Sequence, residues 1–136
     1  MTVSEERGTP ALNAGDLYRL LAEGPWYPTM LLPRQGLVWT AGDRPDRAVA
    51  TLTDHGTSAS VEFRFNDAGE VASIFAAARP RQYGTTYIDT PWEGRFGHYV
   101  SVAGMRVPST GEVGWWVDRR WFPVWKATLA DFSFEF

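Results

Sequence analysis

The sequence predicts an α+β fold that is mainly β: a curved antiparallel meander sheet, or half-barrel, of about seven to nine strands with a broken N-terminal helix packed on its concave face. Two observations lead to this prediction. Apolar residues recur at helical spacing near the N-terminus, and from about residue 36 onward they alternate with polar residues. Glycine-containing turns then separate the alternating segments about every 8–12 residues, as in a meander of hairpins.

The predicted helix is short and interrupted. Asn13 is expected to cap it, and its apolar face carries leucines at the spacing i, i+3, i+4. These leucines are Leu17, Leu20 and Leu21. Gly24 and Pro25 are expected to end the helix, because glycine favours the position after a helix and proline cannot continue its hydrogen bonds. A second helical turn is expected within residues 26–33.

The β region is expected to contain eight alternating segments. They are residues 37–40, 48–53, 58–65, 71–79, 95–102, 105–107, 112–117 and 121–136. In the third segment Val61, Phe63 and Phe65 face one way and Glu62 and Arg64 the other, which is typical of a half-buried antiparallel strand. Turns are expected between these segments, among them one at residues 66–69.

Prolines and a change of alternation mark the expected irregularities. Residues 80–91 begin and end with proline and are expected to be irregular. Pro108 is expected to stop the short strand before it, and residues 109–111 to form a turn. In the last strand the apolar alternation slips between Leu129 and Phe132, which suggests a bulge there.

Length, charge and composition limit the class of protein. The chain has 136 residues, which fits one domain, expected at residues 13–136 after a flexible arm at residues 1–12. It has no cysteine, so disulfides and thiolate metal sites are excluded. The net charge is −3 and the basic residues are scattered, so nucleic acid is not an expected partner. A polar N-terminus and the lack of a long apolar run favour a cytoplasmic protein without an integral membrane segment.

Three sequence blocks point to a known group of proteins. They are W-Y-P-T-M-L-L-P at 26–33, P-W-E-G-R-F at 91–96 with G-M-R-V-P-S-T-G-E-V-G-W at 104–115, and F-P-V-W-K-A-T-L at 122–129. Together they resemble an uncharacterised family of bacterial proteins over about residues 16–136. The order of strands and turns is more distantly similar to lipoprotein carriers of the LolA/LolB type. That resemblance implies an open half-barrel whose apolar concave face is plugged by helices and carries acyl chains or other apolar ligands.

The main functional hypothesis is the binding of an apolar or lipid-like small molecule on the concave face. The aromatic content of 15% is high and fits either an apolar core or an aromatic pocket. Candidate lining residues are Trp26, Met30, Phe63, Phe75 and His98, with Glu93 and Arg95 near the mouth. Trp26 and Met30 lie on the predicted helical plug, and methionine adapts to varied ligands. Trp39, Trp115 and Trp125 are expected to fill the core.

Other interpretations stay open. Glu93 could pair with an arginine across the sheet, such as Arg79, Arg81 or Arg106, and His98 could be a core or edge residue. An interaction module is the second hypothesis, with an exposed tryptophan patch or a sheet edge that recruits a partner or forms a homodimer. A small hydrolase or isomerase that uses His98 and Glu93 ranks last, because no third group orients the base. We expect no catalytic residue, no cofactor and no metal, since two histidines do not make a zinc site.

Overall fold

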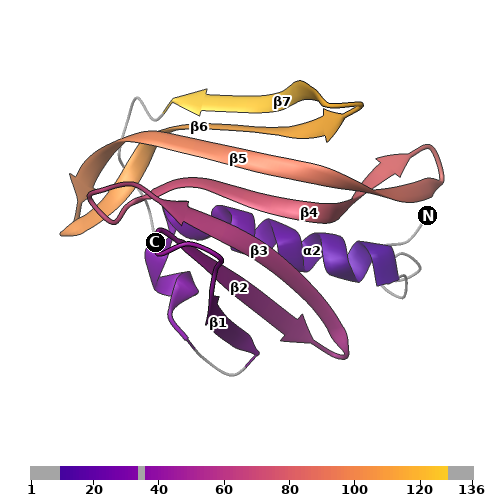
Figure 1. Ribbon diagram of the computed structural model, residues 1–136, viewed down its shortest axis with the longest axis horizontal. Helices are drawn as coiled ribbons and strands as arrows, with labels where there is room; N and C mark the ends of the chain where they lie inside the picture. The colour runs from indigo at the N-terminus through magenta and orange to yellow at the C-terminus, as the bar shows by residue number, and fades with distance from the viewer. Residues whose placement is uncertain (1–9, 34–35, 129–136) are drawn as a thin grey trace.

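A computed structural model describes residues 10–33 and 36–128, and its sheet is a simple meander (Figure 1). The strands are β1 (Leu37–Ala41), β2 (Arg47–Asp54), β3 (Thr57–Phe65), β4 (Val71–Tyr83), β5 (Thr86–Val102), β6 (Met105–Val117) and β7 (Arg120–Thr128). Each strand pairs antiparallel with the next one in the chain, so the order in the sheet is β1 to β7. This confirms the predicted mainly β meander, with seven strands in the described part of the chain.

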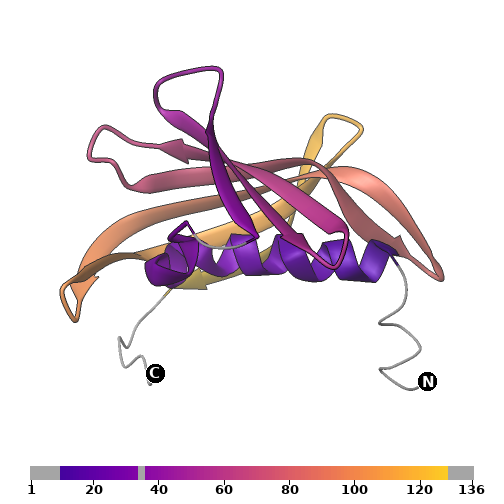
Figure 2. The ribbon, with the colours of Figure 1, turned by 90° about the horizontal axis from the view of Figure 1, so that it is seen from below.

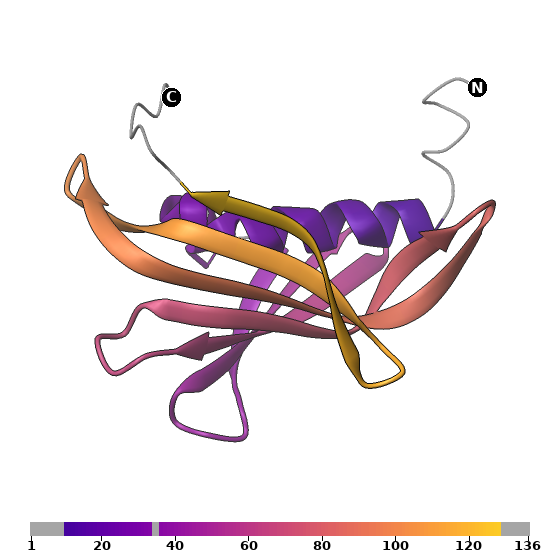
Figure 3. The ribbon, with the colours of Figure 1, turned by 90° about the horizontal axis from the view of Figure 1, so that it is seen from above.

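The helix α2 (Pro10–Glu23) packs across β2, β3 and β4. Figures 2 and 3 show the sheet curving over it, so the helix lies on the concave face. Leu17 and Leu21 are buried against the sheet, whereas Leu20 is 39% exposed. The helix begins at Pro10, so the prediction that Asn13 caps it is wrong. Proline suits the first turn of a helix because the N–H that it lacks would have no partner there.

Two short 3-10 turns follow the helix, as the Gly24–Pro25 break predicts. They are η1 (Gly24–Trp26) and η2 (Pro28–Leu31). The Tyr27 amide donates to the Gly24 carbonyl at 3.0 Å, which closes the first of them. Within the described ranges, no helix has the length and apolar character that crossing a membrane requires.

Tight turns set the register of the hairpins. His55 and Gly56 join β2 to β3, and both have positive φ angles, 49° and 79°. A two-residue turn of this kind matches the twist of the flanking strands. Between β3 and β4, the side-chain oxygen of Asn66 accepts hydrogen bonds from the amides of Ala68 and Glu70, both at 3.0 Å. The turn predicted at residues 66–69 is therefore confirmed.

The strand prolines do not interrupt the sheet as predicted. Residues 80–91 are not irregular, because β4 and β5 continue through them as one long hairpin. Pro91 lies where the β4–β5 register shifts, between the pairs Ala76–Trp92 and Arg79–Thr90, so the ladder tolerates its missing N–H. Residues 105–117 likewise form one strand through Pro108, without the turn predicted at 109–111. The bulge predicted between residues 129 and 132 lies outside the described residues.

Candidate ligand-binding cleft

The sheet is wider than the helix that covers it. A row of residues runs across the concave face because antiparallel partners share a face: Phe63 faces Ile74, then Gly94, Val113 and Trp125 follow on β5, β6 and β7. Phe63 and Ile74 lie in the core cluster beneath α2 and are 0% exposed. At the other end of the row Trp125 is 49% exposed. The apolar surface of the sheet therefore continues beyond the cover of the helix.

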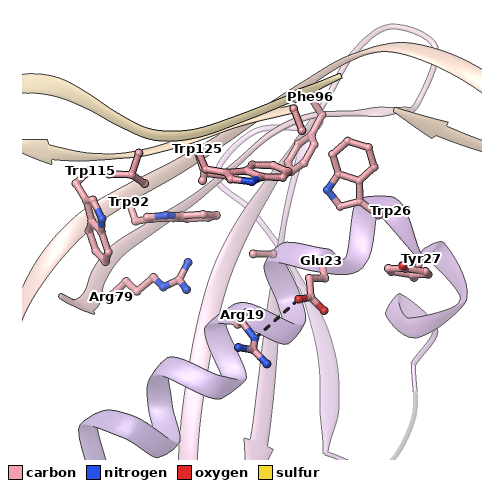
Figure 4. A pocket seen from close by; sticks show the side chains of 13 residues that line it. Arg19, Glu23, Trp26, Tyr27, Arg79, Trp92, Phe96, Trp115 and Trp125 are labelled. Atoms are coloured by element: carbon pink, nitrogen blue, oxygen red, sulfur yellow. Dashed lines mark ion pairs between the residues drawn. The ribbon is translucent and has the colours of Figure 1, made fainter. Parts of the chain in front are cut away.

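A cleft of about 560 Å³ occupies this uncovered part, between the end of α2, η1 and the strands β5, β6 and β7 (Figure 4). Its aromatic lining consists of Trp26, Tyr27, Trp92, Phe96, Trp115 and Trp125. Its charged lining consists of Arg19, Glu23 and Arg79. The volume falls within the range of about 300–1,000 Å³ that is usual for small-molecule sites, and a mostly apolar lining with few polar groups is also typical of them.

Trp26 closes one end of the cleft by packing on bare backbone. Its ring meets Phe96 edge to face, with 5.9 Å between ring centroids and an angle of 76°. A Cβ atom at Gly111 would lie 2.7 Å from Cζ2 of Trp26, so any other residue there would push the indole away. Gly111, in the sequence block at residues 104–115, thus leaves the space into which Trp26, in the block at residues 26–33, packs.

Arg79 lies at the opposite end of the cleft. Its guanidinium is 4.6 Å from the centroid of the Trp92 ring and 5.8 Å from that of Trp115. Within the described part of the chain, no carboxylate lies within 4.0 Å of this guanidinium. Burial lowers the pKa of Arg79, and the positive charge of Arg19 lowers it further, against an opposing effect of Tyr18. Arg79 is therefore a partly desolvated cation without a counter-charge from the residues described.

The predicted lining residues lie at different places. Trp26 lines the cleft. Phe63 lies on the same face but beneath the helix, fully buried, with its ring 4.9 Å from that of Trp39. Phe75 does not face the cleft: Ile74 shares the row of Phe63, so Phe75 points to the convex face, where Arg64 lies 5.1 Å from its ring centroid. Met30 is half-buried on η2 and is not among the residues that line the cleft.

Glu93 and Arg95 lie on the convex face and not at the mouth of the cleft. They pair with each other along β5, with 2.9 Å between Nε and Oε2, and not with Arg79, Arg81 or Arg106. The Trp116 indole N–H donates to Glu93 at 3.1 Å. Arg95 also stacks on Trp121, 4.2 Å from its ring centroid. This side-chain cluster satisfies its own charges, so it needs no ligand.

His98 is exposed at an irregular point of β5. Its φ angle is 51°, and its ring Nδ1 lies 3.2 Å from the Thr110 hydroxyl. The alternation of faces breaks here, since both Phe96 and Tyr99 pack with the core although an odd number of positions separates them. His98 lines a smaller groove of about 320 Å³ next to the cleft, together with Lys126 and others. In the part of the chain that the structure describes, no carboxylate forms an ion pair with His98, and the Thr110 hydroxyl is its side-chain partner.

Metal-ligating groups do not gather in this region. Over residues 10–33 and 36–128, no three His, Asp or Glu side chains lie close enough together to hold a metal ion. The chemistry available in the cleft is therefore that of aromatic surface and one uncompensated arginine.

Residues 1–134 match a family model that is described as a family of unknown function (DUF6920). The chain belongs to this DUF6920 family. That finding confirms the resemblance to a family without an assigned function. A search of curated proteins and a search of solved structures each find no match, so the resemblance of this DUF6920 chain to lipoprotein carriers stays a prediction.

Sequence reasoning missed several residues of the cleft in this DUF6920 chain. Trp115 lines the cleft and also packs against the core, as Trp39 does, whereas Trp125 lines the cleft and is 49% exposed. The Trp39 indole N–H donates to the Leu31 carbonyl at 2.8 Å. Trp92 and Phe96 had a usable signal, since they share one face of P-W-E-G-R-F. Arg79 had a weaker signal, the first of two closely spaced arginines after three alanines.

Proposed function

We propose that this protein binds an apolar or lipid-like small molecule in the cleft between η1 and the concave face of β5, β6 and β7, without acting on it chemically. One observation carries the proposal: the concave face continues past the helix as an open aromatic cleft of about 560 Å³. Trp92 and Phe96 are buried at the base of the cleft, but Trp125 is 49% exposed, whereas a core residue such as Phe63 is fully buried.

The free energy available from this surface is large enough for specific binding. Val124 and Trp125, both on β7 and both lining the cleft, are 58% and 49% exposed. Burial of apolar surface stabilises a complex by roughly 25 cal/mol per Å², so about 300 Å² of ligand surface contributes about 7 kcal/mol. Loss of translational and rotational freedom offsets part of this gain. Low-micromolar affinity is therefore the upper limit for a medium-sized apolar molecule, and the offset places the expected affinity between micromolar and millimolar.

The distant resemblance to lipoprotein carriers gives the proposal a physical form. A curved sheet with a helical plug binds acyl chains when the plug rests on the concave face without sealing it. Here η1 has this role, because Trp26 contacts Phe96 at one end of the cleft while the cleft stays open toward Trp125. An acyl chain is thus the kind of apolar ligand that we propose.

The first test is native mass spectrometry of freshly purified protein, followed by titration with the neutral apolar dye Nile red. Trp125→Ala and Phe122→Ala form a matched pair, since both side chains lie on β7 and are about half exposed, 49% and 46%, but Phe122 does not line the cleft. We expect Trp125→Ala to weaken dye binding about tenfold, which corresponds to about 1.4 kcal/mol, and Phe122→Ala to leave it unchanged. Absence of both a bound mass and saturable dye binding would show that the proposal is wrong.

The outer edge of β7 favours a second candidate, an interaction module. Within the described sheet this strand lies at the edge, and Phe122, Val124 and Trp125 are exposed along it. An exposed apolar edge can pair with another strand, although Pro123 removes one hydrogen-bond donor from it. Light scattering distinguishes the candidates: a stable dimer that excludes Nile red supports the module, and a monomer that binds the dye supports the carrier.

A further inference from the structure

We infer that the ligand of this cleft is an amphiphile with a single carboxylate, whose head group binds the guanidinium of Arg79 while its apolar tail lies toward Trp26. The inference rests on the proposed function, because it names the chemical class of the molecule that the cleft binds.

The first argument is that Arg79 lacks the polar partner that the other half-buried or cluster-forming arginines of the described sheet have. Arg81 donates to the Tyr83 hydroxyl at 2.8 Å. The other four each contact a carboxylate. The pairs are Arg47–Glu62 at 3.6 Å, Arg64–Glu62 at 2.7 Å, Arg95–Glu93 at 2.9 Å and Arg106–Glu70 at 3.1 Å. Among the residues described, Arg79 has only aromatic partners. A buried cation without a counter-charge is costly, and a ligand carboxylate would supply what the chain does not.

The second argument is the geometry of the stack. Trp92 and Trp115 contact the guanidinium at 4.6 Å and 5.8 Å from their ring centroids. Stacking on a ring uses the face of the guanidinium and leaves the N–H groups in its plane free to donate. Two such N–H groups match the two oxygens of a carboxylate, in a bidentate pair that is among the stronger hydrogen-bonded contacts in proteins. The tryptophans therefore hold the donor group in place before a ligand arrives.

The third argument is the charge at the cleft. Arg19 and Glu23 also line it, and they form an ion pair with each other at 3.8 Å. Their charges cancel, so Arg79 leaves one uncompensated positive charge among the lining residues. A monoanion matches this charge, whereas a cationic or zwitterionic head group does not. Burial also lowers the pKa of Arg79, and a bound anion would reverse that effect.

The fourth argument is the shape of the cleft. Figure 4 shows Arg79 beside Trp92 and Trp115, with Trp125 and Phe96 between this group and Trp26. A polar contact is thus available at one end and apolar contacts at the other. This arrangement fits an elongated molecule with one charged end.

The experiment compares four ligands with the same twelve-carbon tail: dodecanoate, dodecanol, dodecyl phosphate and dodecyltrimethylammonium. Each competes with Nile red for the unmodified protein at pH 8. We expect dodecanoate to bind at least about tenfold more tightly than dodecanol and the cation. This preference should vanish as the pH falls below about 5, because the carboxyl group then becomes neutral.

Arg79→Met and Arg95→Met provide the matched variants, since both remove an arginine that stacks on two tryptophans, from opposite faces of the sheet. We expect Arg79→Met to lose the preference for dodecanoate but to keep its affinity for dodecanol, and Arg95→Met to keep both. Arg79→Lys retains the charge without the bidentate geometry and should keep part of the preference. The ligand series on the unmodified protein remains decisive if a variant does not fold.

Each other outcome overturns the inference in a distinguishable way. Equal binding of dodecanoate and dodecanol, or a preference that survives in Arg79→Met, overturns the role of Arg79 and leaves the proposed function intact. A tenfold preference for dodecyl phosphate overturns the choice of a carboxylate. Failure of every ligand and of Nile red overturns both proposals, and a dimer that none of the ligands dissociates shows that a second copy covers the cleft.

Discussion

Arg79 and Arg95 occupy the same part of the sheet but opposite faces, and each lies over two tryptophans. Arg95 is 4.2 Å and 6.0 Å from the ring centroids of Trp121 and Trp116, and Arg79 is 4.6 Å and 5.8 Å from those of Trp92 and Trp115. The surroundings differ in one respect. Arg95 forms an ion pair with Glu93 at 2.9 Å, whereas none of the described carboxylates forms an ion pair with Arg79.

The comparison shows that stacking positions an arginine and that the counter-charge decides what the arginine does. On the convex face Glu93 accepts from the Trp116 indole and Glu112 from the Trp121 indole, both at 3.1 Å. All of these groups have partners, so the cluster stabilises the strands. On the concave face, Arg79 also lies over two tryptophans, but no described carboxylate accepts from its N–H groups. A face with unmet donors beside apolar surface suits a ligand better than a closed cluster does.

The largest effect that the comparison predicts concerns the tryptophans. Trp92 is 3% exposed and supports Arg79, so Trp92→Ala should lower the free energy of unfolding by about 3–5 kcal/mol. Trp121→Ala, on the half-exposed convex cluster, should cost about 1–2 kcal/mol, mainly from the lost contact with Glu112 and Arg95. Urea denaturation of both variants measures the difference. Equal losses would contradict the distinction between a buried support and a surface cluster.

The next largest loss of stability should follow removal of Glu93, the carboxylate that pairs with Arg95 on the convex face. Glu93→Ala leaves the Trp116 N–H and the Arg95 guanidinium without their partner and should cost about 2 kcal/mol of unfolding free energy. Glu112→Ala, which removes the bond to Trp121, should cost about 1 kcal/mol. Nile red should bind both variants as it binds the unmodified protein. Loss of dye binding in Glu93→Ala would mean that the two faces are not independent.

Tyr99 tests whether the partner or the face decides the role of a polar group. It lies on the helix side, yet its hydroxyl donates to the Val71 carbonyl at 2.7 Å, so we expect it to be structural. Tyr99→Phe should lower the unfolding free energy by about 1 kcal/mol at pH 7. Dodecanoate binding should not change. A variant that binds dodecanoate less tightly would show that paired groups on this face also contact the ligand.

The same variant has a pH dependence with a defined sign. Burial raises the pKa of Tyr99, and the nearby Glu70 raises it further, against the bond to Val71. Below about pH 10 the residue is neutral in the folded and unfolded states. Above that pH the unfolded chain ionises first, so the unmodified protein loses stability that Tyr99→Phe does not lose. The stability difference between the two proteins should therefore narrow between pH 9 and pH 11 in thermal melts, and a constant difference would contradict this.

The smallest effect on stability should come from the residue with the largest effect on binding. Arg79→Met removes a desolvated cation along with its stacking, and these contributions oppose each other, so the free energy of unfolding should change by less than about 0.5 kcal/mol. Arg95→Met should cost about 1 kcal/mol, because Glu93 loses its partner. A larger loss in Arg79→Met than in Arg95→Met would identify Arg79 as a structural residue.

The order of elements could be predicted from the sequence because it depends on local signals. The alternation in residues 58–65 and the turn at Gly56, with its positive φ angle, each depend only on residues that are close together in the sequence. Prolines misled the prediction for a physical reason. Because proline lacks an N–H, it does not fit a regular hydrogen-bonded strand pair. Pro91, however, lies where the register between β4 and β5 shifts, and such a shift depends on both strands together.

The site was less predictable, because the register between strands decides which residues lie on the concave face of the sheet. Alternation shows that Trp92 and Phe96 share one face and Glu93 and Arg95 the other, but not which face the helix covers. Residues 91–96 therefore contribute to both the cleft and the convex cluster. The prediction placed Glu93 and Arg95 at the cleft, whereas Trp92 and Phe96 line it. Phe75 was misplaced for the same reason, since its neighbour Ile74, not Phe75, lies opposite Phe63.

α2 precedes in the chain all the strands on which it packs, and this order has a consequence for biosynthesis. Its partners β2, β3 and β4 follow it, and β4 ends only at Tyr83. At roughly 5–20 residues per second, the ribosome needs several seconds between finishing the helix and finishing the surface that it covers. During that interval Leu17 and Leu21 have no sheet to pack against. Because each hairpin joins neighbouring segments, we expect the strands to pair as they emerge and α2 to dock on the sheet afterwards.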